Sequence, residues 1–309
     1  MKLHIIATRP GRLALPFAFA LALGGPATSQ EGGIEVFAAG TLFSKGTRVS
    51  LSHIYKRKGT LFHGTDEISD PLDRTFHEHR FVAAIDHGFR PDLTVSALIP
   101  YVDKELKSDA GDSNSSGLGD VALLAKFRIH KRDWTRSSFN VSAIGGVELP
   151  TGATHERDAG ARLPTELQPG LGSWNPFLGL ATNLSLDRLR FDGLAFYKLN
   201  TEGAQDYEKG NFFALEVAAA YRFLHTKYPG PSASAKLGLQ WRHEDHARDD
   251  GSTIGDSGSD ELRLRPGLTW HPAPNIDISL AVDIPIYQDF NGDQLGTDYR
   301  TFLAIGVRF

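Results

Sequence analysis

The run GNFFALEVAAAYRFL at residues 210–224 alternates with a strict period of two. From Phe212 onward, one face would carry only apolar and aromatic side chains, whereas the other would carry the charged residues Glu216 and Arg222. Successive side chains of a β-strand point to opposite faces of the sheet, so this run predicts a strand whose two faces meet different surroundings. Strands of soluble proteins average about 5–6 residues. A tilted strand that crosses the apolar band of a bilayer explains the greater length.

The same alternation recurs after Gly46, and no stretch sustains the helical period of 3.6. In the fourth of these runs, residues 117–131, the alternation places Ala125 on the face that would contact lipid. It places Ala122 on the opposite face, which would line the lumen of a closed sheet. The pattern predicts twelve strands, at residues 47–56, 77–89, 92–103, 117–131, 137–149, 173–186, 189–200, 210–224, 232–244, 259–271, 275–288 and 298–309.

The predicted connections alternate in length along the chain. Long segments such as 57–76, 150–172 and 245–258 are separated by short ones such as 187–188 and 272–274. Bacterial outer-membrane barrels have short periplasmic turns and longer external loops. A sheet in lipid must close, because an open edge would leave amide groups unpaired where there is no water. The sequence therefore predicts an all-β fold, an antiparallel transmembrane β-barrel of about 12 strands with short periplasmic turns and long external loops.

Composition excludes several other classes of protein. The 309 residues carry a net charge of −4, and no cysteine is present. Disulfides and thiol catalysis are therefore absent, and a nucleic-acid partner, which needs a basic face, is not expected. The longest apolar run, residues 13–23, is too short for a membrane-spanning helix of about 20 residues.

The amino-terminal segment has the features of a secretory signal peptide. Lys2, Arg9 and Arg12 precede the apolar run, and small residues, Ala27 and Ser29, follow it. We expect residues 1–29 to be removed and residues 30–309 to form a single outer-membrane β-barrel domain. Removal takes away three bases and no acid, which changes the net charge from −4 to −7.

The inward faces of the predicted strands carry charges of both signs. These charges either pair with one another and seal the lumen or frame a polar constriction. Inward apolar residues such as Phe177, Phe196 and Phe212 either fill space or form a site for a small apolar solute. The candidate lumen-lining residues are Asp120, Lys126, Arg128, Arg190, Lys198, Glu216, Arg222, Arg263 and Arg265.

Catalytic and metal-binding patterns are weak. Ser52 and His53 are adjacent, so on a strand they point to opposite faces. His77 and His79 share one strand face, but a zinc site needs three or four convergent ligands. The sequence therefore predicts no catalytic residue, no metal and no cofactor, and we do not expect an enzyme.

Three prolines, Pro100, Pro150 and Pro285, lie near the external ends of predicted strands. Proline cannot donate to a sheet ladder, so in a closed sheet it implies a bulge or local unpairing. The prolines either end strands at the rim or mark a lateral gap in the wall.

The last residues, YRTFLAIGVRF, alternate up to the terminal Phe309. This ending resembles the carboxy-terminal signature by which the barrel assembly machinery recognises outer-membrane proteins. The resemblance implies that this machinery is a partner, and that the protein resides in the Gram-negative outer membrane, in contact with its lipid and lipopolysaccharide.

Six short motifs follow one another along the chain: GTLFSKGT at 40–47, GLGDV at 117–121, ELPTG at 148–152, QPGLGSW at 168–174, IPIYQD at 284–289 and NG at 291–292. In their order and spacing these motifs resemble an outer-membrane family of transporters, the MetA-pathway of phenol degradation family. The resemblance implies a barrel that admits small hydrophobic or aromatic molecules by passive uptake; a sealed barrel with a structural or surface-interaction role is the alternative.

Overall fold

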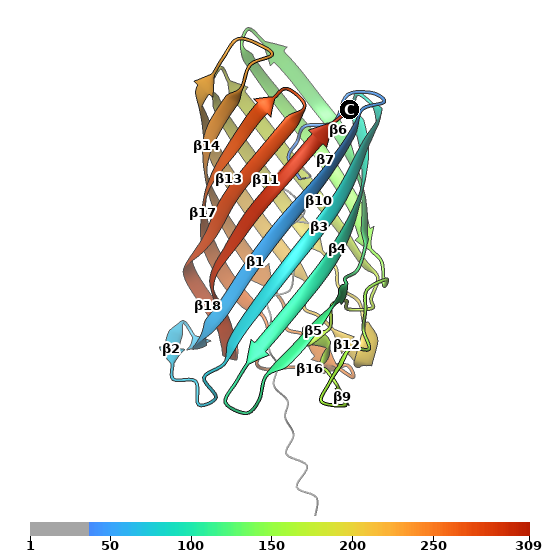
Figure 1. Cartoon of the computed structure of the whole chain (residues 1–309), viewed down its shortest axis with the longest axis vertical. Helices are drawn as coiled ribbons and strands as arrows, with labels where there is room; N and C mark the ends of the chain where they lie inside the picture. The colour runs from blue at the N-terminus through green and yellow to red at the C-terminus, as the bar shows by residue number, and fades with distance from the viewer. Residues whose placement is uncertain (1–36) are drawn as a thin grey trace, which may run out of the picture.

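The computed structural model describes residues 37–309, and eleven of its strands form one closed antiparallel ring (Figure 1). The ring closes where β18 pairs with β1, from Arg48 opposite Arg308 to Leu61 opposite Leu295. The predicted closed, antiparallel all-β fold is therefore confirmed. The ring consists of β1 (Thr47–Gly64), β3 (Thr75–Arg90), β4 (Leu93–Lys107), β6 (Ala122–Trp134), β7 (Ser137–Glu148), β10 (Asn175–Leu186), β11 (Leu189–Lys198), β13 (Phe212–His225), β14 (Ser232–Glu244), β17 (Ser259–Ala273) and β18 (Ile276–Arg308).

The long element β18 contributes two legs to the wall. Its first part, from Ile276 to Phe290, pairs with β17, and its second part, from Phe290 to Arg308, pairs with β1. Both pairings are antiparallel, so the chain reverses direction between them, next to Gly292, whose φ is +69°. If these two legs are counted as separate strands, the wall has twelve strands, which agrees with the predicted number of about 12.

Two segments predicted as loops are mostly strand. β1 continues to Gly64 rather than ending at residue 56, and β18 runs through 289–297. The period-two pattern does not predict these extensions, because most of their residues are polar. Lys58 and Gln294, for example, are polar but are buried inside the barrel. The fourth predicted strand also begins late, at Ala122, because residues 113–118 form the separate strand β5 (Ser113–Leu118) on β4.

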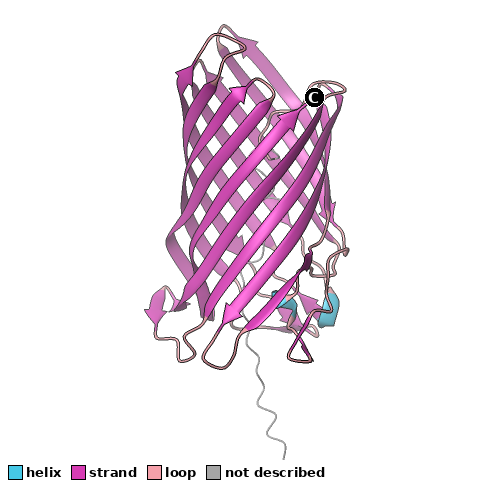
Figure 2. Cartoon of the chain, in the orientation of Figure 1, coloured by secondary structure: helices cyan, strands magenta, loops and turns pink. Residues whose placement is uncertain are grey.

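The two ends of the barrel differ in the length of their connections (Figure 2). We call one the turn end, where short connections join β3 to β4, β6 to β7, β10 to β11, β13 to β14 and β17 to β18. We call the opposite end the loop end. It carries β2 (Asp66–Ile68), β5, β8 (Arg157–Asp158), β9 (Ala161–Arg162), η1 (Thr165–Leu167), η2 (Ala204–Asp206), β12 (Tyr207–Glu208), β15 (Arg248–Asp249) and β16 (Ser252–Thr253).

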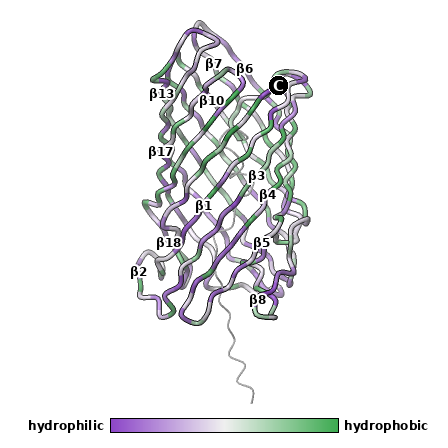
Figure 3. Tube along the Cα trace, in the orientation of Figure 1, coloured by the Kyte–Doolittle hydropathy of each residue, from purple (hydrophilic) through white to green (hydrophobic). Residues whose placement is uncertain are grey.

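The alternation in hydropathy is visible along the strands in Figure 3. Ala125 is exposed on the outer face, whereas Ala122 is buried inside, as the period of two predicted. The four tryptophans, Trp134, Trp174, Trp241 and Trp270, are exposed near strand ends, where aromatic girdles of membrane barrels lie. No helix among residues 37–309 is long and apolar enough to cross a membrane.

Two of the three prolines lie within strands and do not end them at the rim. Pro100 lies within β4, opposite Val82, and Pro285 lies within β18. At Pro285 the pairing with β17 shifts register between Leu262 and Arg263, which is the bulge expected of a proline in a closed sheet.

Candidate functional site: the barrel lumen

A cavity of about 450 Å³ occupies the turn end of the lumen. We call it the vestibule. Its walls come from β10, β11, β13, β14, β17 and β18, and residues of the connecting turns, such as Tyr228 and Pro274, line its mouth. Phe37 and Leu194 supply apolar surface within it. Its charged lining consists of Asp187, Arg188, Arg190, Asp192, Glu216, Arg222, Lys236 and Arg265.

The chain before β1 enters the lumen next to the vestibule. Lys126 Nζ donates to the carbonyl oxygen of Gly40 at 3.0 Å, and Ser142 Oγ donates to that of Ala39 at 2.6 Å. The ring of Phe37 packs edge-on against Phe196, with ring centroids 5.7 Å apart. Residues 37–40 therefore occupy part of the lumen.

An aromatic layer fills the middle of the barrel. Phe196 packs against Phe177 and Phe212, with centroids 5.5 and 6.3 Å apart. Sequence reasoning predicted these three rings to point inward, but it missed Phe37, because residues 37–46 carry no strand pattern that would place them. The buried members of the layer are Phe37, Ala39, Ile54, Val82, Ala84, Leu98, Ala122, Leu124, Ile144, Phe177, Ala181, Phe196, Phe212, Ala214, Ala281 and Phe302.

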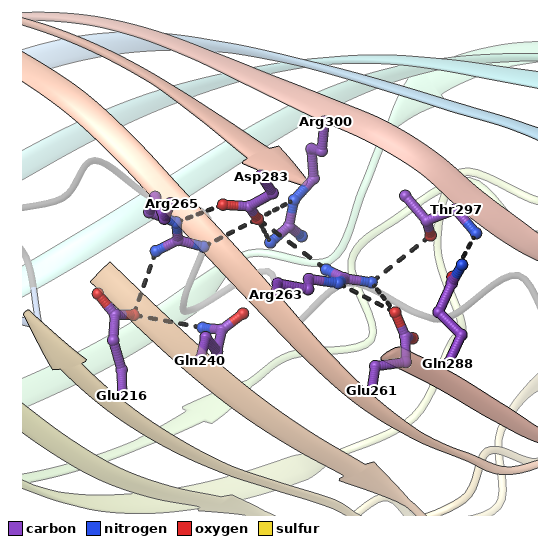
Figure 4. A network of polar contacts seen from close by, with 9 residues as sticks. All are labelled: Glu216, Gln240, Glu261, Arg263, Arg265, Asp283, Gln288, Thr297 and Arg300. Atoms are coloured by element: carbon purple, nitrogen blue, oxygen red, sulfur yellow. Dashed lines mark hydrogen bonds and ion pairs between the residues drawn. The ribbon is translucent and has the colours of Figure 1, made fainter. Parts of the chain in front are cut away.

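Figure 4 shows an ionic network centred on Asp283. The network lies against the aromatic layer, because the guanidinium groups of Arg265 and Arg300 lie over the ring of Phe302. The Asp283 carboxylate accepts hydrogen bonds from Arg265 Nη2 at 3.0 Å and Arg300 Nε at 2.9 Å. Arg263 Nη1 lies 4.0 Å from the same carboxylate, and Arg263 Nε donates to Glu261 at 3.0 Å. Buried charges require partners of this kind, so the network accounts for three arginines on one wall.

A second group of buried charges lies toward the loop end. Glu78 pairs with Lys56 at 2.9 Å and with Arg80 at 2.8 Å. Lys198 pairs with Glu148, and Lys209 pairs with Glu244, each at 3.2 Å. Burial lowers the pKa of Lys209, which lies outside the strands, and the nearby Glu244 opposes that shift. Several basic side chains therefore lie at buried positions toward the loop end, where water solvates them poorly.

The loop end of the lumen is covered by residues 149–174. Leu163 and Leu167 pack on Leu61, Phe76 and Leu295 in a second apolar cluster. Lys104 Nζ holds the covering segment by donating to the carbonyl oxygens of Glu166 at 2.9 Å and Gln168 at 2.6 Å. An apolar cap therefore separates the buried charges from solvent at this end.

The nine candidate lumen residues have three kinds of surroundings. Arg190, Glu216, Arg222 and Arg265 line the vestibule, and Lys198 and Arg263 belong to the buried ionic groups. Asp120, Lys126 and Arg128 hold neighbouring segments in place instead. Asp120 accepts hydrogen bonds from the backbone N–H groups of Gly152 and Leu171, Lys126 binds Gly40, and Arg128 donates to the carbonyl oxygen of Pro91.

The histidines singled out in the sequence lie on the outer face. His79 Nδ1 lies 3.1 Å from His53 Nε2, and His77 Nδ1 lies 2.8 Å from the Tyr55 hydroxyl. Within residues 37–309, no group of three or more histidine or acidic side chains has a geometry that could hold a metal ion.

A family model described as "Putative MetA-pathway of phenol degradation" matches residues 74–303, which is more than half of the chain. The chain belongs to this family. The match covers the wall from the start of β3 to the second leg of β18, so it includes the strands that form the vestibule and the ionic network. The chain has no match among curated protein sequences.

Several solved structures align with this family member, and the first of them shares its fold. The crystal structure of an outer membrane channel from Pseudomonas putida F1 matches with a TM-score of 0.67 and 16% identity, over 88% of this chain and 98% of that one. The β domain of the Bordetella autotransporter BrkA matches with a TM-score of 0.49 and 9% identity, over 86% and 100% of the two chains. The CymD monoaromatic hydrocarbon channel matches with a TM-score of 0.41 and 9% identity, over 87% of this chain and 89% of that one.

Proposed function

We propose that the protein is a channel of the Gram-negative outer membrane for passive uptake of small hydrophobic or aromatic molecules. The observation that carries this proposal is a closed barrel with an apolar outer face around a cavity of about 450 Å³ that adjoins an aromatic layer. A cavity of that volume is in the range of small-molecule sites. Membership of the phenol-degradation family supports the same class of solute.

The proposal includes an orientation. The turn end would face the periplasm and the loop end the exterior, with lipid and lipopolysaccharide around the apolar wall. An epitope tag within residues 245–258 should then be reachable on intact cells, whereas one at residues 187–188 should not. The reverse accessibility would invert the orientation. The proposed signal peptide lies outside the described residues; a mature chain that begins at Gln30 in amino-terminal sequencing would support it.

Two alanines of β13 offer a matched test of uptake. Ala220 lines the vestibule, whereas its neighbour Ala219 is exposed on the outer face. In porin-deficient cells, expression of the barrel should accelerate entry of radiolabelled phenol. Ala220→Trp should slow that entry by narrowing the vestibule, whereas Ala219→Trp should leave it unchanged at equal surface levels.

A sealed barrel with a structural or surface-interaction role is the second candidate. It is favoured by the cap at residues 149–174 and by the entry of residues 37–40 into the lumen. A sealed barrel predicts the same phenol entry in cells with and without the protein, and no difference between the two tryptophan variants. That result would overturn the channel proposal.

A further inference from the structure

The buried charges inside the barrel do not balance. Among the residues that the structure describes, thirteen buried side chains are lysine or arginine and eight are aspartate or glutamate, an excess of five basic side chains. The whole chain carries a net charge of −4. Basic groups are therefore concentrated among the buried residues although the protein as a whole is acidic, and an excess of basic groups favours the binding of anions.

Several of these cations lie directly on the rings of the aromatic layer. The guanidinium of Arg242 lies 4.8 Å from the ring centroid of Phe212, and those of Arg265 and Arg300 lie 4.9 and 4.8 Å from that of Phe302. Such contacts stabilise a cation without neutralising it. A solute at this boundary would meet apolar surface and positive charge together.

Basic side chains also outnumber acidic ones around the vestibule, where the cavity leaves room for a solute. Glu216 is shared by Arg265 at 3.1 Å and Lys236 at 3.8 Å, so one carboxylate serves two cations there. Arg222, on the same wall, makes no ion pair with any residue in the range 37–309. Phe37 and Leu194 line the cavity as well.

We propose that the vestibule binds small aromatic carboxylates, with the ring against Phe37 and Leu194 and the carboxylate toward Arg222 and Lys236. This inference rests on the proposed channel function and specifies aromatic monoanions within its class of small aromatic solutes. Guanidinium and ammonium groups form their strongest hydrogen bonds with carboxylates, so the charged head fixes the orientation of the solute. A cavity of about 450 Å³ holds a single-ring acid together with water.

Equilibrium dialysis of the purified, folded barrel in detergent tests the proposal with two radiolabelled probes, benzoate and its neutral analogue benzyl alcohol. At pH 7 and low salt, benzoate should bind about tenfold or more tightly than benzyl alcohol, the loss expected when a charged hydrogen-bonding partner is removed. The double variant Arg222→Gln/Lys236→Gln should lose about tenfold in benzoate affinity and keep its affinity for benzyl alcohol.

The control is Lys107→Gln/Lys131→Gln, which removes two charges from exposed positions outside the vestibule. It has the same net charge as the test variant, so it should bind benzoate like the wild type. Heat-modifiable migration in gels establishes that each variant is folded.

The outcomes separate this inference from the channel proposal. Equal affinity for the two probes, absence of benzoate binding, or an equal loss in the control variant would overturn the aromatic-carboxylate site. Displacement of benzoate by equimolar chloride would also overturn it, because it would show that the aromatic ring contributes nothing. Benzoate binding without accelerated phenol entry in cells would retain the site and overturn only uptake of neutral solutes.

Discussion

Glu216 and Val217 are consecutive residues of β13 with opposite surroundings. Val217 is 61% exposed on the outer face of the barrel, whereas Glu216 pairs with Arg265 and Lys236 in the lumen. In a soluble protein the apolar residue would be inside and the acid outside. The inversion teaches that this wall separates two media, with lipid expected outside and a polar, partly filled lumen inside.

The two faces also differ in how they tolerate change. The outer face relies on apolar surface that needs no partner, so residues there are interchangeable if they remain apolar. The inner face relies on buried charges whose removal leaves a neighbour uncompensated. Substitutions on the two faces should therefore differ in their effect on the stability of the barrel.

Asp283→Ala should be the most destabilising of these changes. It removes the carboxylate that serves Arg263, Arg265 and Arg300, and breaking a buried pair costs about 3–5 kcal/mol. Urea unfolding of protein refolded into lipid vesicles measures the loss. Asp289→Ala, at a partly exposed carboxylate of the same strand, should stay within about 0.5 kcal/mol. Equal losses in the two variants would contradict the role given to the network.

Arginine at Ala219 and Ala220 compares the two faces at neighbouring positions. Ala219→Arg places a charge on the outer face near the middle of β13 and should cost about 2–4 kcal/mol. Ala220→Arg extends into the vestibule and should be tolerated. This pair is a better test of the two faces than Ala125 and Ala122. Ala122 is packed in the aromatic layer, so arginine there would clash with its neighbours. A larger loss for Ala220→Arg in urea titrations would reverse the assignment of faces.

Deletion of Phe309 tests the exposed carboxy-terminal residue. Phe309 exchanges backbone hydrogen bonds with Thr47, and its ring is exposed at the turn end. If the barrel assembly machinery recognises this ring, the deletion should lower the amount of folded barrel in outer membranes while synthesis is unchanged. Phe309→Tyr is the control that keeps an aromatic end. A normal amount of the shortened protein would show that recognition lies elsewhere.

The carboxylate of Asp70, in the loop after β2, should have a small effect on local stability. Burial raises the pKa of Asp70, but hydrogen bonds from Arg74 and from the backbone N–H of Leu72 outweigh it, so the pKa is lowered overall. A lowered pKa in the folded state means that Asp70 stabilises the loop above its ordinary pKa and loses this effect as the pH falls through the lowered value. The protection factors of the amides in residues 69–74, which correct for the intrinsic slowing of exchange in acid, should fall at acid pH. Asp70→Asn should lower these protection factors at neutral pH as well, with less dependence on pH.

Much of the wall could be predicted from the sequence. The alternation in residues 210–224 depends only on the geometry of an extended chain, which places neighbours on opposite faces. The assignments of Ala122, Ala125, Glu216 and Val217 to faces follow from it, as does the separation of long loops from short turns.

The polar extensions were harder to predict, for a physical reason. Lys56 and Lys58 lie beyond the apolar part of β1, where both faces of the strand carry polar residues and the alternation in hydropathy disappears. Sequence reasoning therefore ended the strand at residue 56. The structure continues it to Gly64 because residues 58–64 pair with the second leg of β18, a partner that a local pattern does not reveal.

The period-two strands, the closed barrel and the faces of most residues in the predicted strands follow from the sequence alone, because they depend on neighbours along the chain. The pairing of charges follows from the folded barrel, since Asp283 binds arginines from β17 and from the second leg of β18. The folded barrel also decides that Phe37 enters the lumen and that residues 149–174 cover the loop end. Those contacts form only when the ring closes and brings together residues that lie far apart in the sequence.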